Sequence, residues 1–206
     1  MEFNIKNMIR PHLLDSKSYQ SLRNSYLQKE VVLLDANENP FGSYNRYPDA
    51  EHLQLKLKLA EINEVQPEQL FLGNGSDELI DLAMRMFCEP TQDAILVFNP
   101  SFVMYEISAK LNNLDVEKLQ LNSDFQLEKE VFQDVISKTK AKILFLCSPN
   151  NPTGNSIDDL EFYIQSFAGI VIVDEAYIEF SKEVSAVSLL TQYSNLIVLK
   201  TLSKAY

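Results

Sequence analysis

The chain has 206 residues, 46% of them hydrophobic and 23% charged, and its formal net charge is −11. This composition is typical of a soluble globular protein, and the acidic balance argues against nucleic acid or an anionic membrane as a partner, because both require clustered Lys and Arg. His12 and His52 are the only histidines. Two histidines are too few to favour a histidine-based metal site or a Ser-His-Asp triad, and we expect no metal. The start "MEFNIKNMIR" lacks the apolar core of a signal peptide, and no stretch approaches the roughly 20 apolar residues of a membrane-spanning helix. We therefore expect a cytoplasmic protein.

The first part of the chain predicts an arm that precedes a larger domain. A polar, partly helical segment leads into "VVLLDANENPFGSYNRYPD" (31–49), a short apolar run followed by an irregular stretch rich in Pro, Asn and Gly. We place the arm at residues 1–45 and the domain at 46–206. Residues 51–62 alternate leucine like a strand, but their Leu, Lys, Glu, Gln and Ala content favours a helix.

From residue 71 the elements become regular. In 77–87, Leu79, Leu82, Ala83 and Met86 follow helical spacing, and Ser76 is a candidate N-cap. Four short, nearly unbroken apolar runs rich in β-branched residues predict buried strands at 94–98, 142–147, 169–174 and 195–200. Helical stretches are predicted between them, at 101–112, 128–138, 158–167 and 183–193. This alternation predicts an α/β fold with a mostly parallel sheet sandwiched by helices.

Ligands of such sheets bind outside the carboxyl ends of the strands, and three polar clusters follow strands there. They are "SPNNPTG" (148–154), "DEAY" (174–177) and "TLSK" (201–204), and "GNGSDE" (73–78) precedes a helix. Each has an ordinary explanation alone, as a turn, an acidic helix start or a capped terminus. Neither a GxxxxGK loop nor a GxGxxG fingerprint is present, which argues against a P-loop or a Rossmann dinucleotide site. Cys88 and Cys147 lie among apolar neighbours and are predicted to be buried, reduced thiols.

The ordered set GNGSDE, PSFVMY, SPNNPTG, VDEAY and TLSK resembles the fold-type I aminotransferases that use pyridoxal 5'-phosphate (PLP). The stretches "IRPHL" and "LLDANENPFGSYNRYPD" resemble the histidinol-phosphate aminotransferase branch of this family. The resemblance runs from about residue 9 to the last residue. It implies the large domain of the fold, truncated before the C-terminal small domain.

The resemblance implies roles for residues at three of the strand ends. Lys204 matches the lysine whose amine forms a Schiff base with PLP and moves a proton. Asp174 matches the carboxylate that keeps the pyridine nitrogen protonated, since a nearby negative charge raises the pKa of that nitrogen. Asn151 and Tyr177 match the donors to the phenolic oxygen of the cofactor.

Further matches concern the cofactor ring and its phosphate. Tyr105 corresponds to the aromatic residue that stacks on the ring. Backbone groups of Ser76 and Asp77 at a helix start, with the Asp77 side chain pointing away, would bind the phosphate. Thr201 and Ser203 match hydroxyl donors to the same phosphate, and Tyr47 resembles a residue that reaches the phosphate of the neighbouring subunit in a homodimer. Glu38 and Asn39 lie where the family builds its substrate-side arm, and we assign neither a catalytic role.

The resemblance implies transfer of the amino group of L-histidinol phosphate to 2-oxoglutarate, which gives imidazole acetol phosphate and glutamate in histidine biosynthesis. Two alternatives stay open: another enzyme of the subgroup, such as an aromatic aminotransferase or a threonine-phosphate decarboxylase, and an inactive module that keeps the sheet for binding. Because the family's substrate-gripping arginines lie beyond the matched motifs, we expect the 206-residue chain alone to be inactive.

Overall fold

A computed structural model describes residues 3–17, 32, 34 and 36–206. The chain divides into two compact units, one of Met1–Leu14 with Gly73–Tyr206 and the other of Asp15–Leu72. The predicted arm at 1–45 and domain at 46–206 stay predictions. The N-terminal segment predicted to be partly helical is described only at residues 3–17, and its remainder, residues 1–2 and 18–30, lies outside the described residues.

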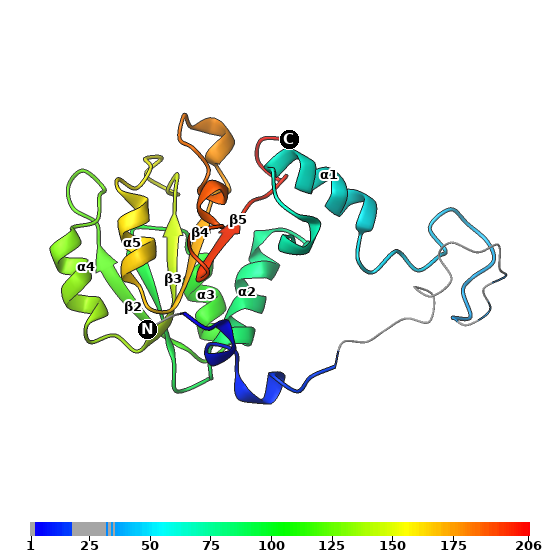
Figure 1. The fold of residues 1–206 in the computed structure, drawn as a ribbon, viewed down its shortest axis with the longest axis horizontal. Helices are drawn as coiled ribbons and strands as arrows, with labels where there is room; N and C mark the ends of the chain where they lie inside the picture. Colours follow the sequence, from blue (N-terminus) through cyan, green and yellow to red (C-terminus); the bar gives the residue numbers. More distant parts are fainter. Residues whose placement is uncertain (1–2, 18–31, 33, 35) are drawn as a thin grey trace. The chain divides into compact units, whose positions relative to one another are not determined.

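The first unit is built on a five-stranded sheet in the order β2-β1-β3-β4-β5, in which every pairing is parallel (Figure 1). Its strands are β1 (Ala94–Asn99), β2 (Asp115–Gln120), β3 (Ala141–Cys147), β4 (Ile170–Asp174) and β5 (Leu196–Leu199). The register pairs Cys147 with Asp174 and Asp174 with Leu199, so the last residues of β3, β4 and β5 are neighbours. The predicted parallel α/β sheet is confirmed, and so is the convergence of its strand ends.

Helices cover both faces of this sheet. On one face α2 (Ser76–Phe87) and α3 (Met104–Leu111) pack through a core that includes Ile80, Met84 and Tyr105. On the other face α4 (Lys129–Ile136) and α5 (Leu160–Ser166) pack through a core that includes Phe132 and Tyr163 (Figure 1). Strand residues alternate between the two cores, as the pleat of a sheet requires. Nearly continuous apolar runs in β1, β3 and β4 follow from this coverage on both sides.

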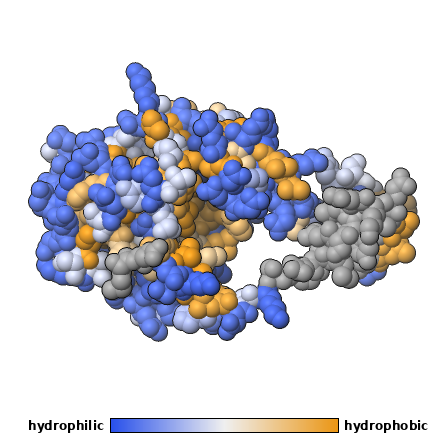
Figure 2. Space-filling model, in the orientation of Figure 1, coloured by the Kyte–Doolittle hydropathy of each residue, from blue (hydrophilic) through white to orange (hydrophobic). Residues whose placement is uncertain are grey.

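The outer surface over α4 and α5 is mostly hydrophilic (Figure 2). Both helices keep one buried apolar stripe and expose the rest: in α4, Phe132 is fully buried while Val131 is 43% exposed. Short 3-10 helices complete the unit, at Ile5–Asn7, Pro11–Leu13, Ile178–Phe180 and Ala186–Leu189. The predicted helix at 183–193 is therefore only one short 3-10 helix. Ser185 begins it by accepting the Val187 N–H, and the Leu190 N–H closes it on Val187.

Strand β2 was not predicted from the sequence. It lies at the edge of the described sheet beside β1, and its residues are mostly exposed or half-buried apart from Leu119. Its sequence DVEKLQ contains charged residues, which edge strands commonly carry. Because these charges interrupt any continuous apolar run, the signal that predicted the other strands is absent from β2.

The second unit contains α1 (Leu53–Asn63) and a short 3-10 helix at Pro67–Gln69. The helix predicted at 51–62 is confirmed; Asp49 accepts the Leu53 N–H at 2.8 Å at its start. Within the residues that the structure describes, no helix is long and apolar enough to cross a membrane, and His, Cys, Asp and Glu form no cluster suited to a metal ion.

Candidate active site

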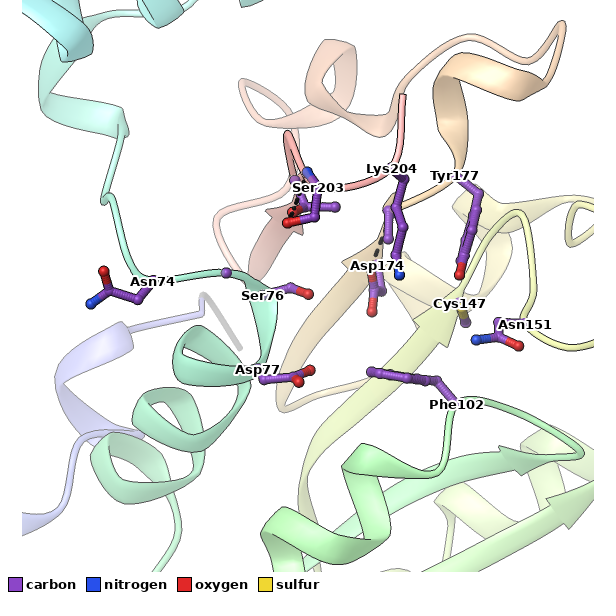
Figure 3. A pocket seen from close by; sticks show the side chains of 13 residues that line it. Asn74, Ser76, Asp77, Phe102, Cys147, Asn151, Asp174, Tyr177, Ser203 and Lys204 are labelled. Atoms are coloured by element: carbon purple, nitrogen blue, oxygen red, sulfur yellow. Dashed lines mark hydrogen bonds between the residues drawn. The ribbon is translucent and has the colours of Figure 1, made fainter. Parts of the chain in front are cut away.

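A pocket opens in the first unit at the carboxyl edge of the sheet (Figure 3). Its wall comes from the α2 start, the loop before α3, and the segments that follow β3, β4 and β5. The lining residues are Asn74, Gly75, Ser76, Asp77, Phe102, Cys147, Asn151, Asp174, Ala176, Tyr177, Thr201, Ser203 and Lys204. Eight of the ten predicted site residues are thus brought together; of the other two, Tyr105 does not line the pocket, and Tyr47 belongs to the second unit.

Asp174 is the buried carboxylate of this pocket. It is the last residue of β4, is 2% exposed, and accepts two hydrogen bonds: Oδ2 from the Tyr105 hydroxyl at 2.7 Å and Oδ1 from the Ala176 N–H at 3.1 Å. Burial raises the pKa of Asp174, and the Asp77 charge adds to this rise, whereas the two hydrogen bonds and the Lys204 charge lower it. A carboxylate held this way is fixed in orientation and has acceptor capacity left for a ligand.

Lys204 brings an amine into the same pocket. Its side chain runs beside that of Tyr177, and both extend from the loops above β4 and β5 toward Asp174 and Asn151 (Figure 3). The Lys204 Nζ lies 5.6 Å from the centroid of the Tyr177 ring, within the range of a cation–π contact. The residue is exposed, so the amine is accessible to a ligand.

The start of α2 supplies backbone N–H groups to the pocket. Gly75 is the N-cap, with φ 81°, so the predicted cap Ser76 is instead the first helical residue. Such a positive φ suits glycine, and the turn aims the first N–H groups of a 12-residue helix at the pocket. Thr201 and Ser203, which follow β5, also line the pocket, and Thr201 donates its hydroxyl to Ser203 at 3.0 Å.

The two acidic residues of this helix start differ in direction. Glu78 turns back to its own loop and accepts the Asn74 N–H at 2.5 Å. Asp77, which we predicted to point away, instead lines the pocket and extends toward its interior (Figure 3). Its repulsion of the Asp174 charge agrees with this orientation. An anionic ligand group would bind here through backbone N–H groups and the helix dipole, against the opposing charge of Asp77.

Tyr105 does not line the pocket, and the stacking role predicted for it does not fit its position. Its ring is 1% exposed and stacks on Phe145 of β3, with centroids 4.6 Å apart. The reason is that Tyr105 lies in α3 on the same face as Ser108 and Ala109, which all face the sheet. Phe102, which precedes the helix, is the aromatic residue on the pocket wall (Figure 3). The i, i+3, i+4 pattern of Tyr105, Ser108 and Ala109 could have separated the two aromatics in the sequence.

Asn150, a buried residue that sequence reasoning passed over, shapes the loop that carries Asn151. It accepts a hydrogen bond from the Ser101 hydroxyl at 3.0 Å and donates to the Pro100 carbonyl at 3.0 Å and to Thr153 at 2.8 Å. It therefore joins the loop after β3 to the loop that carries Phe102. The doubled asparagine in SPNNPTG was the available signal: the first is structural and the second lines the pocket.

The two cysteines are free and buried, as predicted. Burial raises the pKa of Cys88 to about 12 and that of Cys147 to about 11. Cys147 also contributes to the pocket wall, a position that sequence reasoning did not assign.

Tyr47 belongs to the second unit, where it is 66% exposed. Its N–H donates to the Glu38 carboxylate at 2.6 Å, and Arg46 pairs with the same carboxylate at 2.8 Å. The reach of Tyr47 into a neighbouring subunit stays a prediction.

A parallel sheet with an amine, a buried carboxylate and a helix N-terminus around one pocket defines an α/β protein with a small-molecule site at the carboxyl edge of its sheet. The chain belongs to the class I and II aminotransferases, whose family model matches residues 13–206.

Individual members of the family show which aminotransferases the chain resembles in sequence and in structure. The chain is 44% identical over 213 residues to the histidinol-phosphate aminotransferase of Cytophaga hutchinsonii, covering 100% of this chain and 61% of that protein. It resembles the solved histidinol-phosphate aminotransferase of Sinorhizobium meliloti in complex with pyridoxal-5'-phosphate, with a TM-score of 0.70 at 23% identity, over 78% of this chain and 45% of that chain. A decarboxylase from Sulfurospirillum multivorans also matches, with a TM-score of 0.64 at 27% identity, over 73% of this chain and 45% of that chain. The chain spans about 60% of the length of the curated relatives it matches.

Proposed function

We propose that this chain forms the cofactor-binding part of a PLP-dependent aminotransferase that acts on L-histidinol phosphate. The observation that carries the proposal is the convergence of Lys204, Asp174, Asn151 and Tyr177 on one pocket beside the start of α2. These groups match the chemistry of PLP one by one: an amine for its aldehyde, an acid for its ring nitrogen, neutral donors for its phenolic oxygen, and N–H groups for its phosphate.

When bound, PLP supplies an electron sink that makes the Cα–H bond of an amino substrate acidic. The residues of this chain would do the rest. Lys204 would hold the cofactor covalently, and its amine would move the substrate proton. Asp174 would keep the ring nitrogen protonated by charge pairing, and Phe102 would cover a face of the ring. Asn151 and Tyr177 would orient the ring without adding charge.

The amino group of L-histidinol phosphate would pass to 2-oxoglutarate, giving imidazole acetol phosphate and glutamate. The identity to curated relatives supports this substrate pair. The fold alone does not select it, since a decarboxylase shares the fold. A homodimer in which Tyr47 completes the partner's phosphate site, and a cytoplasmic location, belong to the same proposal.

Covalent attachment tests the cofactor assignment. The chain is incubated with PLP, reduced with borohydride and digested, and the pyridoxyl group is located by mass spectrometry. We expect the label on Lys204 and its loss in Lys204→Ala. The control is Lys200→Ala, because Lys200 pairs with Glu179 at 3.3 Å and does not line the pocket. Equal labelling of the Lys204→Ala and control variants would disprove the assignment.

Substrate choice is tested separately on the full-length gene product. We expect kcat/KM to be highest for histidinol phosphate, compared with phenylalanine and threonine phosphate, and threonine phosphate not to lose CO₂. A preference for phenylalanine would make the protein an aromatic aminotransferase. The 206-residue chain alone is expected to show negligible turnover, and turnover equal to that of the full-length product would contradict this.

A further inference from the structure

The hydroxyl of Tyr105 lies beneath the pocket and points at its carboxylate. The phenolic oxygen is 2.7 Å from Asp174 Oδ2, and this hydrogen bond joins residues 69 positions apart in the sequence. Both residues are almost fully buried, at 1% and 2% exposure. Tyr105 therefore contacts the floor of the site from the core, without reaching the pocket itself.

The ring of Tyr105 is held so that its hydroxyl has little freedom. It stacks on Phe145 with an interplanar angle of 17°, and Phe102 meets it edge to face at 5.6 Å. Phe102 in turn lines the pocket. The aromatic cluster thus fixes the direction of the hydroxyl, and the hydroxyl fixes the carboxylate.

Asp174 is held from two sides by donors of different kinds. The Ala176 N–H is part of the turn that follows β4, and the Tyr105 hydroxyl comes from α3. With one donor on each oxygen, the plane of the carboxylate is set, and its remaining lone pairs are free to accept from the pocket side. A single donor would leave the group free to rotate about its Cβ–Cγ bond.

We propose that Tyr105 is a positioning residue, which holds the Asp174 carboxylate in the plane and the ionised state required to pair with a protonated pyridine nitrogen. The inference rests on the proposed function for the identity of the ligand, but the hydrogen bond can be tested without any ligand. This positioning role replaces the stacking on the cofactor ring that the sequence predicted for Tyr105. In the proposed function, Phe102 covers the ring instead.

The surroundings keep Tyr105 a donor at neutral pH. Burial raises the pKa of its phenol well above the ordinary value, and the charge of Asp174 acts in the same direction. The other groups that face Asp174 are the Asp77 carboxylate and the Lys204 ammonium, and the Cys147 thiol lies close by. Asp77, Lys204 and Cys147 all line the pocket, whereas Tyr105 does not. Substitution of Tyr105 therefore removes a hydrogen-bond donor to Asp174 and leaves the pocket wall unchanged.

The test compares two buried tyrosines. Tyr105→Phe keeps the ring and removes the hydroxyl. Tyr163→Phe is the matched control: Tyr163 is 2% exposed, donates to the Leu127 carbonyl at 2.7 Å, and belongs to the core on the opposite face of the sheet. Each variant loses one buried hydroxyl, so the effects on folding are comparable and only one touches Asp174.

The first measurement follows the titration of Asp174 by NMR in the ligand-free chain labelled with 13C-aspartate. A hydrogen bond to the ionised form lowers the pKa of a carboxyl, so Tyr105→Phe should move the titration to higher pH, and Tyr163→Phe should not. Replacing Tyr105 by 3-fluorotyrosine, a more acidic donor of nearly the same shape, should move it to lower pH. Identical titrations in all four proteins would overturn the proposal, and the 3-fluorotyrosine arm retains this power if Tyr105→Phe does not fold.

The second measurement is the dissociation constant for PLP, from the change in its visible absorbance. We expect Tyr105→Phe to weaken binding about tenfold relative to Tyr163→Phe, in line with the loss of one hydrogen bond to a charged group. Asp174→Asn should weaken it about 100-fold, as loss of a buried charge partner does. Equal PLP affinity in the two tyrosine variants overturns the proposal. Absence of PLP binding by the unmodified chain would instead count against the proposed function, while the NMR titration would still decide the role of Tyr105.

Discussion

Two neighbouring carboxylates at the end of β4, Asp174 and Glu175, have almost the same environment but face different parts of the molecule. Each is at most 2% exposed, each accepts one hydroxyl and one backbone N–H, and burial raises the pKa of each. Asp174 accepts from Tyr105 and Ala176 and faces the pocket; Glu175 accepts from Ser185 at 2.5 Å and Ala186 at 2.6 Å and does not line it.

The comparison teaches that burial and hydrogen bonding do not by themselves identify a functional carboxylate. The alternation of side chains along an extended chain places consecutive residues on opposite sides. Glu175 therefore holds the segment that contains the 3-10 helix Ala186–Leu189 by accepting hydrogen bonds from it. Asp174 instead has lone pairs left to accept from a ligand. Only the pocket distinguishes a structural from a ligand-binding acid here.

The largest expected effect of removing the Glu175 carboxylate is on stability. Glu175→Ala leaves the Ser185 hydroxyl and the Ala186 N–H without their acceptor inside the protein, which should lower the free energy of unfolding by about 2 kcal/mol. Urea denaturation measures this. Glu183→Ala, an exposed acid in the same segment, should stay within about 0.5 kcal/mol of the unmodified chain.

The folded Glu175→Ala variant should also keep its affinity for PLP, in contrast to Asp174→Asn. If Glu175→Ala weakened PLP binding as strongly as Asp174→Asn, the division into a structural and a ligand-binding carboxylate would be wrong.

A smaller effect concerns the pH dependence of stability. Because burial raises the pKa of Asp174 in the folded state, its contribution to stability is fully present below the unfolded pKa and is lost as the pH rises through the folded pKa. Asp174→Asn does not titrate. Relative to the unmodified chain without ligand, its free energy of unfolding should therefore increase as the pH rises from the unfolded pKa through the raised folded pKa.

Glu175→Gln should show the same direction, because burial raises the pKa of Glu175 as well. Urea denaturation at several pH values checks both variants. A difference from the unmodified chain that is constant with pH would show that the buried acids are not held with raised pKa values.

The sequence predicted most of the fold, since continuous apolar strands and an amphipathic α2 are strong local signals. It missed β2, whose charged residues suit an exposed edge. It also predicted a helix at 183–193. There, Ser185 donates its hydroxyl to Glu175 and begins a short 3-10 helix instead. Both errors arise where tertiary contacts decide the local structure.

The position of the pocket could be predicted, because the strand ends of a parallel sheet meet at one edge and polar motifs follow them there. The roles of the residues in those motifs stay predictions. The failures concern side-chain direction. Tyr105 and Phe102 are three residues apart, and the start of α3 between them turns one into the core and leaves the other on the pocket wall. Asp77 and Glu78 are adjacent, and only one is captured by the loop before it. Such directions depend on contacts with segments far away in the sequence.

The pocket gathers residues from Asn74 to Lys204, and this order has a consequence for synthesis of the protein. The amine of Lys204 is made last, after the helix start, the aromatic wall and both loops are already in place along the chain. Domains begin to fold from the N-terminus as they emerge from the ribosome. A ligand that depends on Lys204 for capture can therefore bind only after every strand of the described sheet has been synthesised.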